Sequence, residues 1–373
     1  MTQRINLRTQ RDLKPIVQTV VDSLRAGQLV VLPTETVYGL AAALASEAAI
    51  DRLFAVKGRD PANPLAVAVS GLEMLEDFLT NLTEEQKRLP RRVWPGPVTI
   101  VLPVDPEEHF LRQLPKTALP AIYANGHIGF RVPNHPFTLD VIKKLEQPIV
   151  LTSANRSGQG ECVNTDEITK SLGPEVELMI EDGPAKSDKP STVVRLEGRD
   201  AKILREGAVS EAAINRLLAR IIIFVCTGNT CRSPMAEVLC RNLLANHFQC
   251  SLEEVENRGY VIMSAGVAAS DQSTASSAAQ QVVMARGMSL ADHLSQPLNE
   301  THIRFADKIY AMTRNHRETI LSFWPSADTR LFVLRTDGGD IADPYGGSIS
   351  LYDDCADQIE DELMKRMKEI LGK

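Results

Sequence analysis

The sequence of 373 residues lacks the features that mark membrane and secreted proteins. No stretch approaches the roughly 20 apolar residues that a membrane helix needs. The first 14 residues are polar and lack the apolar centre of a secretion signal. Six cysteines at irregular spacings do not resemble a disulfide framework. We therefore expect a cytoplasmic protein with no membrane partner.

An excess of positive charge is also missing. The net charge is −7, with 41 basic and 48 acidic residues. The chain up to Arg220 carries 27 basic and 28 acidic residues, and the remainder carries 14 and 20. An acidic second part argues against a nucleic-acid-binding tail there, whereas the nearly neutral first part leaves room for a local basic patch.

The first 220 residues mix helical and strand patterns, which predicts an α/β or α+β unit with a sizeable core. Apolar residues recur at helical spacing in three segments, 11–27, 47–56 and 84–93. Short apolar runs predict strands at 29–32, 65–69, 98–102, 128–131, 149–152 and 192–196. Weak helix signals over 206–220 suggest a segment that joins this unit to the next.

Strict alternation of strand and helix begins after residue 220. It predicts a parallel sheet with helices on both faces. The expected strands are 221–225, 260–264, 308–311 and 330–333. The expected helices are 234–245, 274–286, 315–321 and 353–371. The fold class is therefore α/β in both parts.

The first of these strands leads into a loop suited to phosphate. A strand, a tight loop and a helix place backbone N–H groups around an anion. Gly228 allows the loop to turn, Ser233 can cap the helix, and Pro234 suits its first turn. Arg232 can bind two phosphate oxygens, and together with the loop it would favour the thiolate form of Cys226. The loop thus fits covalent catalysis through a phosphocysteine.

Such a reaction needs a general acid for the leaving group. The sequence offers Asp343 in the loop segment Asp343–Ser348, which reads DPYGGS. Taken singly, Asp-Pro is more often a surface turn, and Cys226 could equally be a buried structural cysteine. The combination of strand, C-x5-R and helix cap favours the catalytic interpretation.

From about residue 221 to its end the chain resembles the low-molecular-weight protein tyrosine phosphatases. The motifs are CTGNTCRSPMAE at 226–237, SAG at 264–266 and Asp-Pro-Tyr at 343–345. The resemblance implies that Cys226 is the nucleophile, Arg232 the phosphate clamp and Asp343 the acid and later the base. It also implies a phosphatase half without metal or other cofactor, and a phosphate loop that Asn229 and Ser233 shape and that contains Thr227, Gly228, Thr230 and Cys231. Cys231 could form a reversible disulfide with Cys226, or simply be a packed small residue.

The substrate branch depends on a few positions. The bacterial branch that acts on phosphoarginine has Thr where Thr230 stands and an Asp-Pro-(Phe/Tyr)-Gly-Gly-Ser segment, as here. The tyrosine-specific branch usually has an aliphatic residue at the Thr230 position. Arsenate reductases of this fold need further cysteines, and none occurs between Cys250 and Cys355. We expect a phosphoarginine-bearing protein as substrate, with phosphotyrosine as the alternative and a neutral Thr230 left open.

The first unit carries weaker single signals. Lys57 and Arg59 beside a turn could hold a polyphosphate or form a solvated helix end. Ser153 and Asn155 follow a buried strand, where both ligand sites and plain turns occur. The ordered series PTETVYGL (33–40), KGR (57–59), NPL (63–65), WPGPVT (94–99), GFRVP (129–133), SAN (153–155), STV (191–193) and LREG (204–207) resembles the YrdC-type threonylcarbamoyl-AMP synthases.

This resemblance covers about residues 8–210 and implies that ATP, L-threonine and bicarbonate form threonylcarbamoyl-adenylate with release of pyrophosphate. The product would serve the tRNA-modification machinery that makes threonylcarbamoyladenosine. Cations and hydroxyls would offset the substrates' negative charge. Mg²⁺ would bridge the phosphates without protein side chains as ligands. The implied ATP-binding residues are Lys57, Arg59, Asn63, Ser153, Asn155 and Arg205, and the implied threonine-binding residues are Thr36, Arg131 and Ser191.

The first unit departs from its relatives in two respects. Several relatives have a histidine where this chain reads Ala66–Ala68, which leaves the shape of the threonine pocket uncertain. The longer synthases also carry a different C-terminal domain. An RNA-binding first half is the alternative, although its near-zero charge disfavours phosphate-backbone binding. We therefore expect a bifunctional enzyme with a synthase domain at 8–210, a linker at 211–220 and a phosphatase domain at 221–373.

Overall fold

The computed structural model describes every residue except 1, 117, 188, 199 and 373. The chain divides into two compact units, residues 1–217 and 218–373. The ten residues expected to join them form helix α9 (Glu211–Leu218) and the beginning of strand β12. None of the described helices combines the length and the apolar character needed to cross a lipid bilayer.

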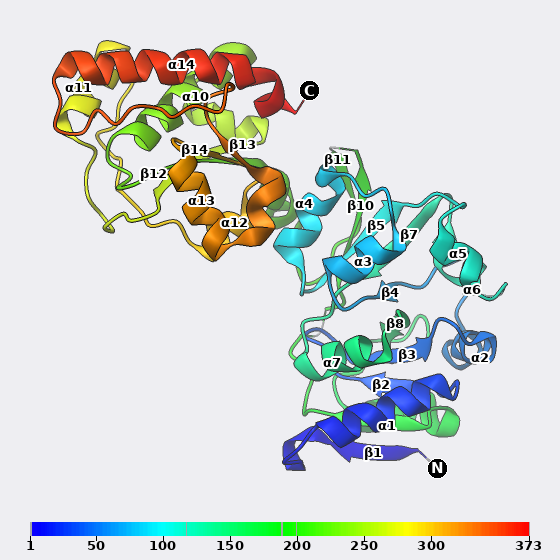
Figure 1. Ribbon diagram of the computed structural model, residues 1–373. Coiled ribbons are helices and arrows are strands. Elements are labelled where there is room, and N and C mark those ends of the chain that lie inside the picture. The colour runs from blue at the N-terminus through cyan, green and yellow to red at the C-terminus, as the bar shows by residue number, and fades with distance from the viewer. Residues whose placement is uncertain (1, 117, 188, 199, 373) are drawn as a thin grey trace. The chain divides into compact units, whose positions relative to one another are not determined.

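The first unit is built on one large mixed sheet (Figure 1). Its strand order is β1-β9-β2-β3-β8-β4-β7-β5-β10-β11, and β6 pairs with β7. The sheet contains both parallel pairs, such as β5 with β10, and antiparallel pairs, such as β3 with β8. The strands are β1 (Gln3–Asn6), β2 (Val30–Leu32), β3 (Gly39–Ala43), β4 (Val67–Ala68), β5 (Val98–Pro103), β6 (Tyr123–Ala124), β7 (His127–Arg131), β8 (Ile149–Ser153), β9 (Leu178–Glu181), β10 (Thr192–Glu197) and β11 (Asp200–Arg205).

Helices pack against this sheet through apolar stripes. Helix α1 buries Val20, Val21 and Leu24 in a core that also contains Val141 and Leu145 of α7. Helix α2 begins where the Ser46 side chain accepts the Ala49 N–H and ends at Gly58 with φ +58°. The helices are α1 (Lys14–Arg25), α2 (Glu47–Lys57), α3 (Leu72–Phe78), α4 (Glu84–Val93), α5 (His109–Gln113), α6 (Ala118–Ile122), α7 (Pro136–Leu145) and α8 (Thr165–Leu172), with 3-10 turns at Leu7–Thr9 and Gly173–Glu175.

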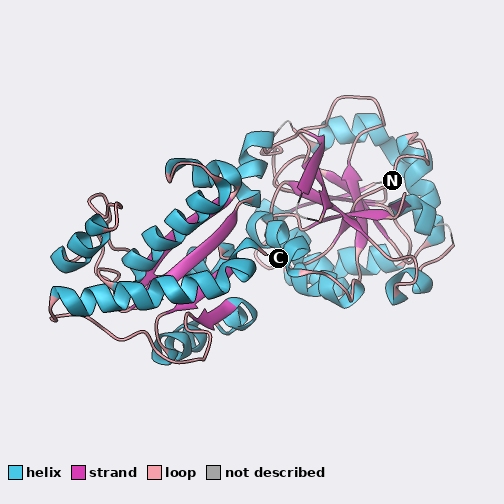
Figure 2. Ribbon diagram, turned by 90° about the horizontal axis from the view of Figure 1, so that it is seen from above, coloured by secondary structure: helices cyan, strands magenta, loops and turns pink. Residues whose placement is uncertain are grey.

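The second unit has a four-stranded, wholly parallel sheet in the order β13-β12-β14-β15. Figure 2 shows helices on both sides of its strands. Helices α10, α11 and α14 share one apolar core, and α12 and α13 share another on the opposite face. The predicted layout is thus confirmed. The elements are β12 (Arg220–Cys226), α10 (Arg232–Phe248), β13 (Tyr260–Gly266), α11 (Ser277–Ala285), α12 (Glu300–Phe305), β14 (Lys308–Ala311), α13 (Arg314–Phe323), β15 (Leu331–Val333) and α14 (Ile349–Leu371), with 3-10 turns at Glu253–Arg258 and Pro325–Arg330.

Candidate active sites

The first unit contains a cavity of about 400 Å³ with a strongly cationic lining. Residues of β3, β5, β6, β7, β8, β10 and β11 line it. The described lining holds four arginines and no Asp or Glu, namely Arg59, Arg131, Arg195 and Arg205. Burial and repulsion from Arg205 lower the pKa of Arg59. Such a lining suits a ligand that carries several negative charges.

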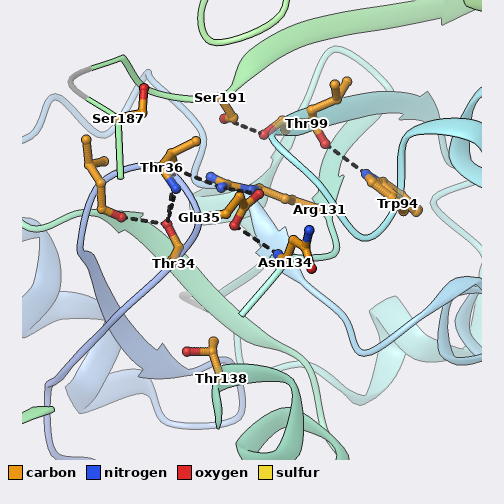
Figure 3. Close-up of polar contacts among 12 residues, drawn as sticks. Thr34, Glu35, Thr36, Trp94, Thr99, Arg131, Asn134, Thr138, Ser187 and Ser191 are labelled. Carbon is orange, nitrogen blue, oxygen red and sulfur yellow. Dashed lines mark hydrogen bonds and ion pairs between the residues drawn. The ribbon is translucent and has the colours of Figure 1, made fainter. Parts of the chain in front are cut away.

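Two of the predicted threonine-binding residues, Arg131 and Ser191, line this cavity. Arg131 donates from Nη2 to Thr36 Oγ1 at 2.8 Å, as Figure 3 shows. Thr36 is buried and lies outside the lining, so it contacts the cavity through Arg131. Ser191 Oγ lies 2.9 Å from Thr99 Oγ1 and also accepts from Arg205 at 3.4 Å. The three predicted residues therefore belong to two hydrogen-bonded groups, Arg131 with Thr36 and Ser191 with Thr99 and Arg205.

A chain of hydroxyl groups fixes the Thr36 side chain. The Thr34 hydroxyl donates to the Val37 carbonyl at 2.6 Å and accepts the Thr36 N–H at 3.1 Å. Thr34 has only one hydroxyl hydrogen, so the Thr36 hydroxyl is the donor in the 3.0 Å contact between them. Thr36 Oγ1 is thereby left as an acceptor, and Arg131 uses it.

The predicted ATP-binding residues divide into two groups. Arg59, Ser153 and Arg205 line the cavity. Lys57, Asn63 and Asn155 lie outside the described lining. The ATP contacts of all six residues stay predictions, and the structure places Lys57, Asn63 and Asn155 in the framework around the cavity.

Lys57 is almost fully buried and bonded to backbone. Its Nζ donates to the carbonyls of Ser153 and Asn155, the latter at 2.8 Å. Asn155 in turn donates to the carbonyls of Gln159 and Gly160. Burial, with a smaller contribution from a neighbouring guanidinium, lowers the Lys57 pKa to about 8. These bonds tie the end of α2 to the loop after β8.

The second site lies at the end of β12, in the loop that leads into α10. Cys226 is buried, and its Sγ lies 3.0 Å from Ser233 Oγ. The Asn229 N–H donates to the same sulfur at 3.3 Å. An N–H donor of this kind stabilises a thiolate. The role of Cys226 as the nucleophile stays a prediction.

Asn229 holds this loop in shape. Its φ is +56°, in the left-handed region, and it is completely buried. Its Nδ2 donates to Ser233 Oγ at 3.0 Å and to Ser264 Oγ at 2.9 Å. Its Oδ1 accepts the Gln296 N–H. Gly266 packs closely against the same residue, because a Cβ built on Gly266 would lie 3.0 Å from the Asn229 backbone nitrogen.

Arg232 and Asp343 face each other across the loop. Arg232 Nη2 donates to Asp343 Oδ2 at 2.6 Å, and Nη1 donates to the Ile341 carbonyl at 3.2 Å. The buried Arg232 Nε has no hydrogen-bond partner among the described atoms. Asp343 is half-exposed. Among the described residues the guanidinium thus keeps one unused donor, and the carboxyl group that it binds is partly open to solvent.

The remaining loop residues differ in how firmly they are held. Thr230 is half-buried, and among the described residues its Oγ1 contacts only the Cys231 sulfur, at 3.7 Å. Cys231 is buried and contacts Ser276 Oγ at 3.4 Å and the Tyr352 hydroxyl at 3.3 Å. Both cysteines of the loop are free thiols in the structure, and the disulfide between them stays a prediction.

Two family models match the chain in succession. Residues 22–207 match the family of Sua5, YciO and YrdC proteins, described as "Telomere recombination", and residues 221–373 match "Low molecular weight phosphotyrosine protein phosphatase". The chain belongs to both families. After these families and their relatives, residues 1–217 are called the synthase half and residues 218–373 the phosphatase half.

Known relatives agree with this division. The threonylcarbamoyl-AMP synthase of Pyrococcus abyssi is 32% identical over 60% of this chain and 63% of its own length, so the chain spans less than two thirds of that relative. A protein-arginine-phosphatase of Geobacillus stearothermophilus is 41% identical over 40% of this chain and 95% of its own length. A solved mutant structure of P. abyssi Sua5 is 25% identical with a TM-score of 0.52, covering 72% of this chain and 92% of that one.

Sequence reasoning missed several residues of both halves. In the synthase half, Glu35 pairs with Arg131. Arg195 lines the cavity from β10, and the alternation of side chains along that strand could have indicated this position. In the phosphatase half, His293 Nε2 lies 2.8 Å from the Asn229 carbonyl oxygen. His316 Nε2 lies 2.8 Å from Thr227 Oγ1, and nothing in the sequence pattern pointed to it.

His316 is a neutral support for the phosphate loop. Its Nδ1 lies 2.9 Å from Thr313 Oγ1, so both ring nitrogens have partners. Burial, and then repulsion from Arg232, lowers the His316 pKa to about 4. The ring is therefore uncharged near neutral pH, and it fixes the Thr227 side chain.

Proposed function

We propose that the chain is a bifunctional enzyme. The synthase half forms threonylcarbamoyl-adenylate from L-threonine, bicarbonate and ATP. The phosphatase half hydrolyses phosphoproteins, with phosphoarginine as the preferred substrate. The observation that supports the first activity is the four-arginine cavity, and the one that supports the second is Arg232 facing Asp343 beside Cys226.

In the synthase half, the amine of threonine and bicarbonate would form a carbamate with loss of water. A carbamate oxygen would then attack the α-phosphorus of ATP, and the bond to pyrophosphate would break. Arg59 and Arg205 would stabilise the charge on the phosphates, and Arg131 would bind the threonine carboxylate. Mg²⁺ that arrives with ATP fits best on the phosphate oxygens, because the described lining offers no Asp or Glu, and it would neutralise charge on the departing pyrophosphate.

The product of this half would be passed to the machinery that modifies tRNA. The direct test is pyrophosphate release by the purified chain with ATP, Mg²⁺ and bicarbonate, with and without L-threonine and without added RNA. Threonine-dependent release supports the synthase activity. Absence of release, together with RNA binding by the same chain, would favour the alternative of an RNA-binding first half.

In the phosphatase half, the Cys226 thiolate would attack phosphorus while Asp343 protonates the leaving nitrogen or oxygen. Water, deprotonated by Asp343, would then attack the phosphocysteine and release inorganic phosphate and the thiolate. Before the first step, the incoming phosphate would replace Asp343 on Arg232, because both anions use the same guanidinium. That exchange would free the carboxyl group to act as the acid.

Phosphoarginine is favoured over phosphotyrosine by Thr230 and by Gly346 and Gly347, which follow the Asp-Pro-Tyr segment. The test is phosphate release from phosphoarginine-bearing and phosphotyrosine-bearing proteins, with Cys226→Ser as the inactive control. A preference for phosphoarginine supports the proposal. A preference for phosphotyrosine would leave the phosphocysteine mechanism intact and overturn the role of Thr230.

A further inference from the structure

The end of β7 meets the loop before β3 in a nearly buried ion pair. Arg131 Nη2 donates to Glu35 Oε1 at 3.0 Å, and the two side chains are only 12% and 11% exposed. The other carboxylate oxygen, Oε2, accepts the backbone N–H of Asn134 at 2.9 Å. Figure 3 shows Glu35 between Arg131 and Asn134. Each oxygen of Glu35 therefore has its own donor, which fixes the plane of the carboxylate.

Glu35 itself does not belong to the described lining of the cavity, whereas Arg131 does. Any influence of Glu35 on a ligand therefore passes through the guanidinium. Arg131 is held at Nη2 by two acceptors, Glu35 and Thr36. Its buried Nε has no partner among the described atoms. A guanidinium anchored at one nitrogen, with an unused donor, is prepared to bind an anion.

The electrostatic surroundings explain why Arg131 needs this anchor. Three further arginines line the same cavity, and burial, followed by repulsion from Arg131, lowers the pKa of Arg205. A long cationic side chain in such a group would move toward solvent unless a counter-charge held it. Glu35 is the acidic side chain that the structure pairs with Arg131.

We propose that Glu35 is a positioning residue for the amino-acid substrate, which holds Arg131 in the orientation that binds the carboxylate of L-threonine. This inference rests on the proposed threonine-dependent function of the synthase half. Glu35 would then do more than join the loop to β7, because it would affect the binding of one group, the carboxylate of threonine. It would not affect the binding of the ATP phosphates.

The test uses the full chain with Glu35→Gln, which keeps the size of the side chain and removes its charge. Glu76→Gln is the matched control, since Glu76 forms a 2.7 Å ion pair with Lys87 and neither residue lines the cavity. Calorimetric titration measures the Kd of L-threonine and of L-threoninamide, which lacks the carboxylate. Pyrophosphate release gives kcat and the KM values for threonine and ATP.

We expect Glu35→Gln to raise the Kd and KM of threonine by about tenfold, the effect of weakening one charged hydrogen bond. The KM of ATP should change less than about twofold, and the preference for threonine over threoninamide should shrink by about the same tenfold. Glu76→Gln should change none of these values. An unchanged threonine Kd, or an equal loss of affinity for threonine and threoninamide, would overturn the proposal.

Two further results distinguish a failure of this inference from a failure of the proposed synthase activity. A wild-type chain that binds threonine but releases no pyrophosphate would refute the synthase activity, while the Kd comparison would still decide the role of Glu35. A wild-type chain that does not bind threonine would refute both. If Glu35→Gln does not fold, Glu35→Asp decides, because the shorter carboxylate cannot reach both donors. Its threonine Kd should rise, and a wild-type value would overturn the proposal.

Discussion

Arg232 and Asp343 are joined by a 2.6 Å ion pair, although the chain runs from the start of α10 to the loop before α14 between them. Arg232 is 5% exposed and Asp343 is 49% exposed, so one member of the pair is buried and the other is open to solvent. We expect phosphate to displace the exposed carboxyl group and to leave the buried guanidinium in place.

Replacing Asp343 with Asn should keep a hydrogen bond to Arg232 and remove proton transfer. We expect kcat for phosphoprotein to fall by about 10²–10⁴-fold, the usual contribution of a general acid. The loss should be smaller with p-nitrophenyl phosphate, whose leaving group needs less protonation. Steady-state rates with both substrates measure this difference. Equal losses with the two substrates would contradict a general-acid role.

Thr230→Val should change the substrate preference more than it changes the structure of the phosphate loop, because among the described residues Thr230 Oγ1 has only a long contact with the Cys231 sulfur. We expect the ratio of kcat/KM for phosphoarginine over phosphotyrosine proteins to fall at least about tenfold, which is about 1.4 kcal/mol. Thr319→Val on α13 is the control, since its hydroxyl bonds only the Asn315 carbonyl. The hypothesis fails if both variants keep the wild-type ratio.

Asn229→Ala should destabilise the phosphatase half by roughly 2–4 kcal/mol, because it removes buried hydrogen bonds and forces a positive φ on alanine. Asn229→Gly should be about 1 kcal/mol less harmful, since glycine tolerates that φ. Urea unfolding followed by Trp324 fluorescence, in a Trp94→Phe background, measures both. Equal stability of the two variants would show that the backbone strain is unimportant.

His316 predicts a pH dependence of stability in the same half. Its folded-state pKa of about 4 lies below the ordinary value of 6.5, so the unfolded chain binds the proton more readily between these values. Stability is therefore lost as the pH falls through this window, by about 2 kcal/mol between pH 7 and pH 5. His316→Gln should flatten that part of the profile, measured with the same Trp324 signal. A variant with the wild-type slope would contradict the assignment.

The sequence predicted most of the phosphatase half because its elements are local. Each strand from β12 to β15 is a short apolar run followed by a helix, and the chain order determines the parallel sheet. The helix expected at 353–371 begins earlier, at Ile349, directly after its N-cap residue Ser348. The expected helix 274–286 is shorter, and Thr274 instead pairs with Leu294 in an isolated bridge.

The synthase half was harder to predict because its sheet is assembled from distant segments. Strand β3, Gly39–Ala43, is a run of small residues that has no clear period, and it becomes a strand by pairing with β8. Strand β1 pairs with β9, although most of the unit's sequence lies between these two strands. Glu35 was not predicted as a site residue for a related reason. An acidic residue is not expected beside a site for anions, and only the fold brings it to Arg131.

The crowding at Gly266 bears on how this protein can evolve. A Cβ there would lie 2.5 Å from the Thr227 carbonyl oxygen and 3.0 Å from the Asn229 nitrogen, so any replacement pushes directly on the loop. Thr230, by contrast, is half-buried and weakly held. A substitution at residue 230 should therefore disturb the loop less than one at residue 229 or 266. If Thr230 sets the substrate preference, as proposed above, that preference can change while the backbone around Asn229 is kept.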